Sequence, residues 1–256
     1  MNLLAAFFTA FSMYSILPVP KAEWGPKSMK YAMCFFPLVG VAVGLFFFLW
    51  AQLSAFWGLG VFLRSAVCVF LPVLVSGGIH MDGFCDTTDA LCSRQPAEKK
   101  LEILKDSHAG AFAVIGCTLY FLLSFGLWTE LRLTKEAVCV LGIGFVLSRA
   151  LSGLSVVTFR CAKSSGLVAA FSDAAAKRQV RLVLVCYLAL CAAGLLFVHP
   201  LLGGAALLAA AAAFCIYRRV SYRGFGGTTG DLAGWFLQVC EFLMLLGVTA
   251  AQKLPQ

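Results

Sequence analysis

The chain has 256 residues, of which 61% are hydrophobic and only 12% are charged, and its formal net charge is +8. Ordinary soluble domains are about 45–50% apolar and roughly 25% charged, so this composition excludes a water-soluble globule and a disordered chain. It indicates an integral membrane protein. In such a protein an excess of Lys and Arg is explained by cytoplasmic loops, so we expect no nucleic acid partner.

Residues 1–20 are apolar, but they lack the preceding basic residue and the small-residue cleavage pattern of a signal peptide. Their polar residues and the closing Pro18-Val19-Pro20 suit an interfacial or re-entrant segment at least as well as a full membrane span. Whether this segment crosses the membrane stays open.

Seven uncharged stretches follow in the chain. A helix needs roughly 20 residues to cross the hydrocarbon core of a membrane. The fold class predicted is all-α, a polytopic integral membrane helical bundle of about seven transmembrane helices that forms a single catalytic domain over residues 1–256. We expect the spans near residues 31–50, 60–79, 109–128, 137–158, 182–198, 201–217 and 232–251.

The basic residues give this bundle an orientation. If the loop 21–30 is cytoplasmic, the loops 80–108, 159–181 and 218–231 share its side, and the four loops contain 15 of the 20 Lys and Arg. The positive-inside rule favours this arrangement. Arg149 lies inside a predicted span, where an isolated Arg is taken as functional, and the alternative is an ion pair that only holds two helices together.

Three aspartates fall within eight residues where the second predicted span ends. Asp82, Asp86 and Asp89 are spaced by four and three residues, which places them on one face of a helix. Like charges on one stripe repel, so such a stripe is usually kept for a cation. Because an Asp at the bilayer centre costs about 2.5–3.5 kcal/mol, we expect the cluster near the cytoplasmic end of the span or in a hydrated cavity. The alternative is a solvated helix start.

Two further segments on the same side have candidate site residues. Asp106 precedes the third predicted span, where it and Ser107 make a reasonable N-cap. Arginines and a glycine-rich turn precede the last span and Asp231, a combination suited to phosphate oxygens. The candidate phosphate-binding residues are Lys105, Arg149, Arg218, Arg219, Arg223, Gly226, Gly227, Thr228 and Gly230.

Oxygen ligands without Cys or clustered His favour a hard cation, and Mg²⁺ typically bridges carboxylates to substrate phosphates. Phosphoryl transfer needs a metal, a phosphate cradle and an oriented nucleophile. These residues therefore predict a membrane-embedded, Mg²⁺-dependent phosphotransferase with a cytoplasmic active site. The rival hypotheses are a membrane transporter that uses intramembrane carboxylates in two matching halves, and a non-catalytic membrane scaffold.

The motifs Gly77–Leu91, Lys100–Phe112 and Gly226–Asp231 resemble those of the adenosylcobinamide-GDP ribazoletransferase (cobalamin synthase) family, and the likeness extends over nearly the whole chain. The resemblance implies a multi-pass enzyme of the bacterial inner membrane in late cobalamin biosynthesis. Such an enzyme joins adenosylcobinamide-GDP to α-ribazole or its 5′-phosphate, releases GMP and requires Mg²⁺. Its partners would be these two substrates and membrane lipid, and a homo-oligomer is left open.

On this resemblance Asp82 and Asp86 would hold Mg²⁺, with Asp89 as a further ligand or as the base. Asp106 and Asp231 are additional catalytic candidates. The sequence departs from the family pattern at His108, where an Arg is expected, and at Cys85, where a small Ala is usual. The first departure weakens any phosphate role at that position, because imidazole is mostly neutral at pH 7.

Overall fold

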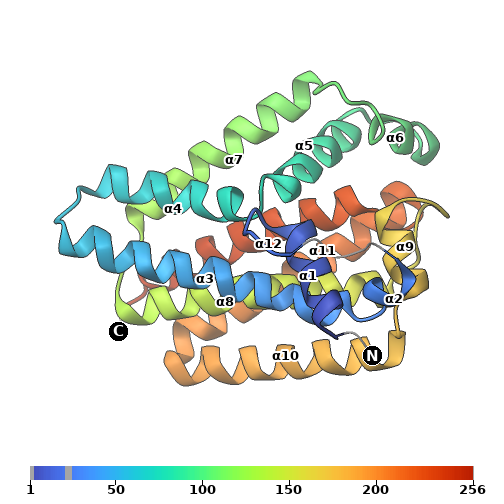
Figure 1. Ribbon diagram of the computed structural model, residues 1–256. Helices are drawn as coiled ribbons and strands as arrows, with labels where there is room; N and C mark the ends of the chain where they lie inside the picture. The colour runs from blue at the N-terminus through green and yellow to red at the C-terminus, as the bar shows by residue number, and fades with distance from the viewer. Residues whose placement is uncertain (1–2, 21–24, 256) are drawn as a thin grey trace.

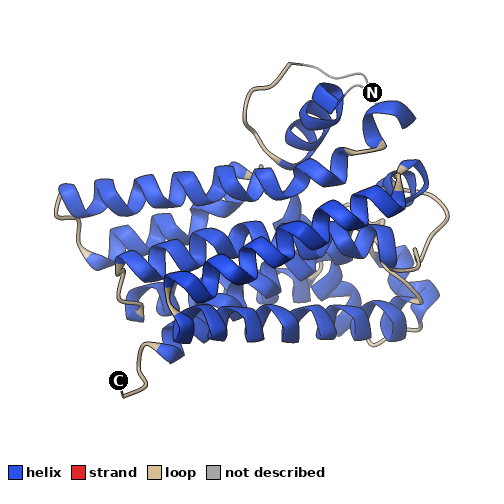
Figure 2. Cartoon of the chain, turned by 90° about the horizontal axis from the view of Figure 1, so that it is seen from below, coloured by secondary structure: helices blue, strands red, loops and turns tan. Residues whose placement is uncertain are grey.

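The computed structural model describes residues 3–20 and 25–255, and the regular structure in these ranges is helical. Figure 1 shows most of the long helices side by side along one axis, and the view turned by 90° in Figure 2 shows the same bundle. The helices are α1 (Leu3–Tyr14), α2 (Pro26–Met29), α3 (Ala32–Phe56), α4 (Val61–Val75), α5 (Ile79–Cys92), α6 (Ala97–Ile103), α7 (Ala111–Glu130), α8 (Lys135–Thr158), α9 (Leu167–Ala174), α10 (Lys177–Val198), α11 (Pro200–Phe225) and α12 (Gly230–Ala251).

Among the described residues, six helices are long and apolar enough to cross a membrane: α3, α7, α8, α10, α11 and α12. They confirm the predicted polytopic helical bundle. The span predicted near 60–79 differs, because α4 ends at Val75 and the chain turns by 94° into α5. Gly77 and Gly78 make this turn with φ angles of +65° and +79°, a left-handed conformation that favours glycine. The α4–α5 pair is therefore a broken span or a re-entrant pair.

The first helix is too short to cross the membrane alone. Its 12 residues extend about 18 Å, whereas the hydrocarbon core is about 30 Å thick. The α1 helix lies against α3, where the Phe7 and Phe35 rings meet edge to face at 5.9 Å. The Ile16 amide donates to the Val75 carbonyl at 2.9 Å, which attaches the segment after α1 to the break in the α4–α5 pair. This placement fits the interfacial or re-entrant alternative.

The loops predicted to share a side do gather at one end of the bundle. In Figure 1 the helices α2, α6 and α9 lie at the right, and the C-terminus lies at the left. The loop after α8 pairs with the α11–α12 turn through a bridge between Cys161 and Thr228, and Arg160 Nη2 donates to the Gly226 carbonyl at 2.7 Å. Of the 15 basic residues counted on this side, Lys21 lies outside the described residues.

Candidate functional site

The site begins at the contact between α5 and α12. A Cβ atom on Gly83 would lie 2.7 Å from the Asp231 carbonyl oxygen, and one on Gly234 would lie 3.1 Å from the His80 carbonyl oxygen. The two backbones can therefore approach this closely only because both positions are glycine. The pairing of 83 with 231 and of 80 with 234 makes the helices antiparallel. It brings Asp82, near the start of α5, next to Asp231 in the first turn of α12.

Asp82 and Asp231 line one cavity of about 250 Å³, which we call the larger cavity. Its walls come from α1, α3, α5, α8, α9 and α12, and they are mostly apolar. The two carboxylates are the acidic groups among its lining residues. Its remaining wall includes Tyr14, Met33, Phe36, His80, Val156 and Leu237.

A second cavity of about 180 Å³, the smaller cavity, lies between the loop after α8 and the start of α12. Its walls are more polar, since Lys163, Ser165 and Thr229 line it. Gly230 and Asp231 line both cavities, so the two meet at the first turn of α12. This junction joins an apolar space to a space with a cationic side chain.

Lys163 is the cation of the smaller cavity. Partial burial lowers the pKa of its ammonium group, the negative charge of Asp231 opposes that shift, and the positive charge of Lys105 adds to it. Lys163 and Asp231 line the smaller cavity together, and Lys105, a predicted phosphate-binding residue, is close enough for its charge to act on Lys163. The hydroxyl of Thr229 caps α12 by accepting from the Leu232 amide at 3.2 Å, and it donates to Asp231 Oδ2 at 3.3 Å.

The predicted aspartate face is present on α5. Asp82 is exposed, Asp86 and Asp89 are half-buried, and the Asp86 carboxylate is repelled by the charges of Asp82, Asp231 and Asp89. Within the ranges 3–20 and 25–255, however, no three His, Cys, Asp or Glu side chains stand close enough together to hold a metal ion. The predicted residues Asp82, Asp86 and Asp89 therefore share one face of α5, but their three carboxylates are not close enough together to bind one metal ion.

Asp89 is turned toward another helix. Its Oδ1 accepts from the Ala113 amide at 3.3 Å in the first turn of α7, and a Cβ on Gly110 would overlap its carboxylate. The N-cap predicted at Asp106 and Ser107 is wrong, because α7 begins at Ala111 with Gly110 as its N-cap.

Asp106 instead orders its own loop. Its Oδ1 accepts from the backbone amide of His108 at 3.0 Å and contacts the imidazole Nδ1 at 2.8 Å. These contacts lower the pKa of the Asp106 carboxyl, the backbone hydrogen bond most strongly. The side chain is exposed, and it is not among the lining residues of either cavity.

The predicted arginines and glycines divide into separate groups. Arg218, Arg219 and Arg223 are exposed along α11 around an open groove that shares no lining residue with the two cavities. Gly226 ends α11 with a φ of +74°, and a Cβ on Gly227 would lie 2.5 Å from the Arg160 carbonyl oxygen. These two glycines therefore shape the turn, whereas Thr228 and Gly230 line the smaller cavity.

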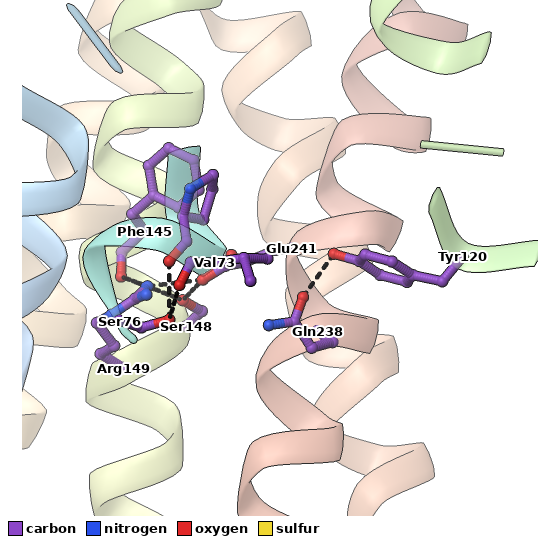
Figure 3. A network of polar contacts seen from close by, with 9 residues as sticks. Val73, Ser76, Tyr120, Phe145, Ser148, Arg149, Gln238 and Glu241 are labelled. Atoms are coloured by element: carbon purple, nitrogen blue, oxygen red, sulfur yellow. Dashed lines mark hydrogen bonds and ion pairs between the residues drawn. The ribbon is translucent and has the colours of Figure 1, made fainter. Parts of the chain in front are cut away.

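Arg149 lies in the buried polar network of Figure 3, where its side chain is 1% exposed. Its Nη1 donates to Glu241 Oε1 at 2.6 Å and to the Phe145 carbonyl at 2.9 Å, and the Ser148 hydroxyl donates to the same Glu241 oxygen. The ion pair joins α8 to α12. This arrangement matches the ion-pair alternative for Arg149, whose side chain is not among the lining residues of either cavity.

Lys163 and Ser165 line the smaller cavity but are not among the site residues predicted from the sequence. The available signal was the short polar segment Lys163-Ser164-Ser165-Gly166, which stands alone between apolar stretches on the basic side of the chain. His80 lines the larger cavity and is likewise absent from the predicted site residues, because its neighbours in the sequence suggest no partner for it.

Comparisons with known proteins show which family the chain belongs to. The family profile described as Cobalamin-5-phosphate synthase matches residues 6–249. An adenosylcobinamide-GDP ribazoletransferase of Lachnoclostridium phytofermentans is 50% identical over 98% of this chain and 96% of its own length. Proteins of the same name from Clostridium botulinum and Pseudomonas fluorescens are each 32% identical, over 95% and 94% of this chain and 96% and 98% of their own lengths.

No solved structure matches the chain. The family profile and the relatives cover nearly all of the sequence, including both helices that meet at Asp82 and Asp231. The chain therefore belongs to the cobalamin-5-phosphate synthase family.

Proposed function

We propose that the chain acts as an adenosylcobinamide-GDP ribazoletransferase, which joins adenosylcobinamide-GDP to α-ribazole or its 5′-phosphate and releases GMP. Family membership supports this reaction. The structural observation that carries it is the junction at Asp231, where an apolar cavity meets a cavity lined by Lys163 and the start of α12. A reaction that joins an aromatic nucleoside to a diphosphate needs both kinds of space.

In this reaction a ribose hydroxyl oxygen of α-ribazole forms a bond to the cobinamide-side phosphorus of the diphosphate. The bond from that phosphorus to the oxygen of GMP breaks, and GMP leaves with the electron pair. Asp82 or Asp231 accepts the hydroxyl proton, since both carboxylates line the larger cavity and Asp231 lies at its junction with the smaller one. Lys163 and the first amide groups of α12 hold diphosphate oxygens, because a helix N-terminus favours anions.

Because no three acidic side chains among the described residues stand close enough together to hold a metal ion, Mg²⁺ would be held by one or two of Asp82, Asp86 and Asp231 together with oxygens of the substrate. These residues fit this ion because all three offer carboxylate oxygens, and because the Asp86 carboxylate is repelled by both of the others when no cation stands between them. When bound, the ion neutralises negative charge on the diphosphate. Asp89 is the weaker candidate, since its carboxylate already accepts from α7.

We place the enzyme in the cytoplasmic membrane of a bacterium with this junction on the cytoplasmic side. The relatives are bacterial, and the loops around the junction are among those that contain 15 of the 20 Lys and Arg. A transporter would need broken helices in two matching halves, whereas one helix pair is bent among the described residues.

The test is GMP release by the purified, detergent-solubilised protein supplied with adenosylcobinamide-GDP and α-ribazole. We expect release that a chelator abolishes and added Mg²⁺ restores. Asp82→Asn and Asp231→Asn should lower turnover at least about 100-fold, the scale of losing an acid–base or charge-stabilising group.

The matched control is Asp173→Asn, an exposed position on α9 that lines neither cavity. It should keep wild-type turnover, and all three variants should elute as folded protein. Full activity of Asp82→Asn and Asp231→Asn would remove the junction from the reaction, and no GMP release by the wild type would overturn the proposed function itself.

A further inference from the structure

We infer that the larger cavity binds the benzimidazole base of α-ribazole, with His80 as a hydrogen-bond donor to the base. This inference rests on the proposed function and assigns one of its two substrates to one of the two cavities. The cavity of about 250 Å³ exceeds the roughly 150 Å³ that accommodates benzene in a protein interior. It therefore suits a two-ring base and is too small for a corrinoid.

Aromatic rings form one wall of this cavity. The Tyr14 and Phe36 rings lie 4.3 Å apart between centroids, and each lies 5.9 Å from the His80 ring. The Tyr14 and His80 rings are stacked at an angle of 17°. Flat π surfaces of this kind favour an aromatic ligand over an acyl chain, because offset stacking and edge contacts add to simple burial.

His80 supplies a specific polar atom. Its side chain is 4% exposed, and its Nε2 is buried without a hydrogen-bond partner. A buried ring nitrogen left unpaired is costly, and its ring lines the larger cavity, so we expect a ligand in that cavity to supply the missing partner. In α-ribazole one benzimidazole nitrogen is bonded to ribose and the other has a free lone pair, which Nε2–H can meet as a donor.

The two carboxylates fix which way the nucleoside would lie. Asp82 and Asp231 line the larger cavity, and Asp231 also lines the smaller one. With the base held among the rings, the ribose points to the carboxylates, and its hydroxyl faces the diphosphate held near Lys163. The base then positions the nucleophile without touching the reacting phosphorus.

The first experiment narrows the larger cavity. Ala233 on α12 lines it, so Ala233→Phe should raise the KM for α-ribazole at least tenfold and leave the KM for adenosylcobinamide-GDP unchanged. The matched control is Ala250→Phe, the same change on the same helix at an exposed position, which should leave both constants unchanged. An unchanged KM for α-ribazole in Ala233→Phe would overturn the inference.

The second experiment tests the donor. His80→Leu should raise the KM for α-ribazole at least tenfold, and His80→Gln, which keeps an N–H donor, should recover part of the loss. Equal losses in both variants, or a loss confined to the KM for adenosylcobinamide-GDP, would contradict the assignment.

A third measurement uses the wild type and does not depend on the folding of any variant. The free base 5,6-dimethylbenzimidazole should inhibit GMP release competitively against α-ribazole and not against adenosylcobinamide-GDP. Competition with the other substrate, or no inhibition, would overturn the inference. In each case wild-type GMP release remains, so this failure is distinguishable from failure of the proposed function.

Discussion

The carboxylate of Asp89 is held by its surroundings in a way that the other site aspartates are not. It accepts from the Ala113 amide, and the bare Cα of Gly110 leaves the space that it fills. The first amides of a helix lack partners within the helix, so an acceptor from α5 stabilises the start of α7. At the residue scale Asp89 therefore serves to connect two helices.

This role makes a prediction that separates Asp89 from the metal candidates. Asp89→Asn keeps the accepting oxygen and should retain both thermal stability and GMP release within about threefold of the wild type. Asp89→Ala removes the acceptor and should lower stability by about 1 kcal/mol, the usual cost of losing a cap. Thermal unfolding in detergent and GMP release measure the two effects. A collapse of turnover in Asp89→Asn, equal to that of Asp82→Asn, would instead make Asp89 a metal ligand or the base.

At the scale of elements, the contact between α5 and α12 decides whether the site exists. Gly83 and Gly234 let the two backbones approach, and only this approach brings Asp82 to Asp231. Because α4 and α5 are separate helices joined at 94°, α5 can lie against α12 and does not have to continue the line of α4. The glycine turn at Gly77 and Gly78 thus sets the direction of the helix that presents the aspartates.

Gly83→Ala tests this contact. The new methyl group would lie 2.7 Å from the Asp231 carbonyl oxygen, so the helices must separate, at a cost of about 1–3 kcal/mol for overpacking. We expect lower thermal stability and a loss of GMP release larger than the stability change alone explains. Gly204→Ala on α11 is the control, since a Cβ there meets nothing within 4 Å, and it should be neutral or slightly stabilising. Wild-type turnover in Gly83→Ala would show that the spacing of α5 and α12 does not position the carboxylates.

The elements differ in how far their sequences could predict them. Six spans follow from uncharged stretches long enough to cross a bilayer, and the shared face of Asp82, Asp86 and Asp89 follows from their spacing. The only sign of the break in the second predicted span that the sequence contains is the pair Gly77 and Gly78. The link from Asp89 to α7 and the approach of Gly83 to Asp231 join residues far apart in the chain, and a single sequence has no local signal for such contacts.

At the scale of the whole molecule, the charged groups occupy distinct positions along the axis of the helical bundle. The polar junction lies at the end with the basic loops, and the buried Arg149–Glu241 pair joins α8 to α12 within the bundle. A buried ion pair is costly to break at one partner, by about 3–5 kcal/mol, so it is consistent with a structural connection between spans. Arg149 was a phosphate-binding candidate because it lies within a span, and the network shows that its charge is paired with Glu241 and that it lines neither cavity.

The positions of the lysines along the bundle axis predict which of them are accessible from each face of the membrane. Lys99 and Lys105 are exposed at the end with the junction, and Lys135 is exposed at the start of α8, which lies at the opposite end. In inside-out vesicles a membrane-impermeant amine reagent should label Lys99 and Lys105, and in right-side-out spheroplasts it should label Lys135, with peptide mass spectrometry as the readout. Permeabilised membranes, in which all three should react, are the control. Labelling of Lys99 and Lys105 from outside would reverse the orientation, because 15 of the 20 basic residues would then face away from the cytoplasm against the positive-inside rule.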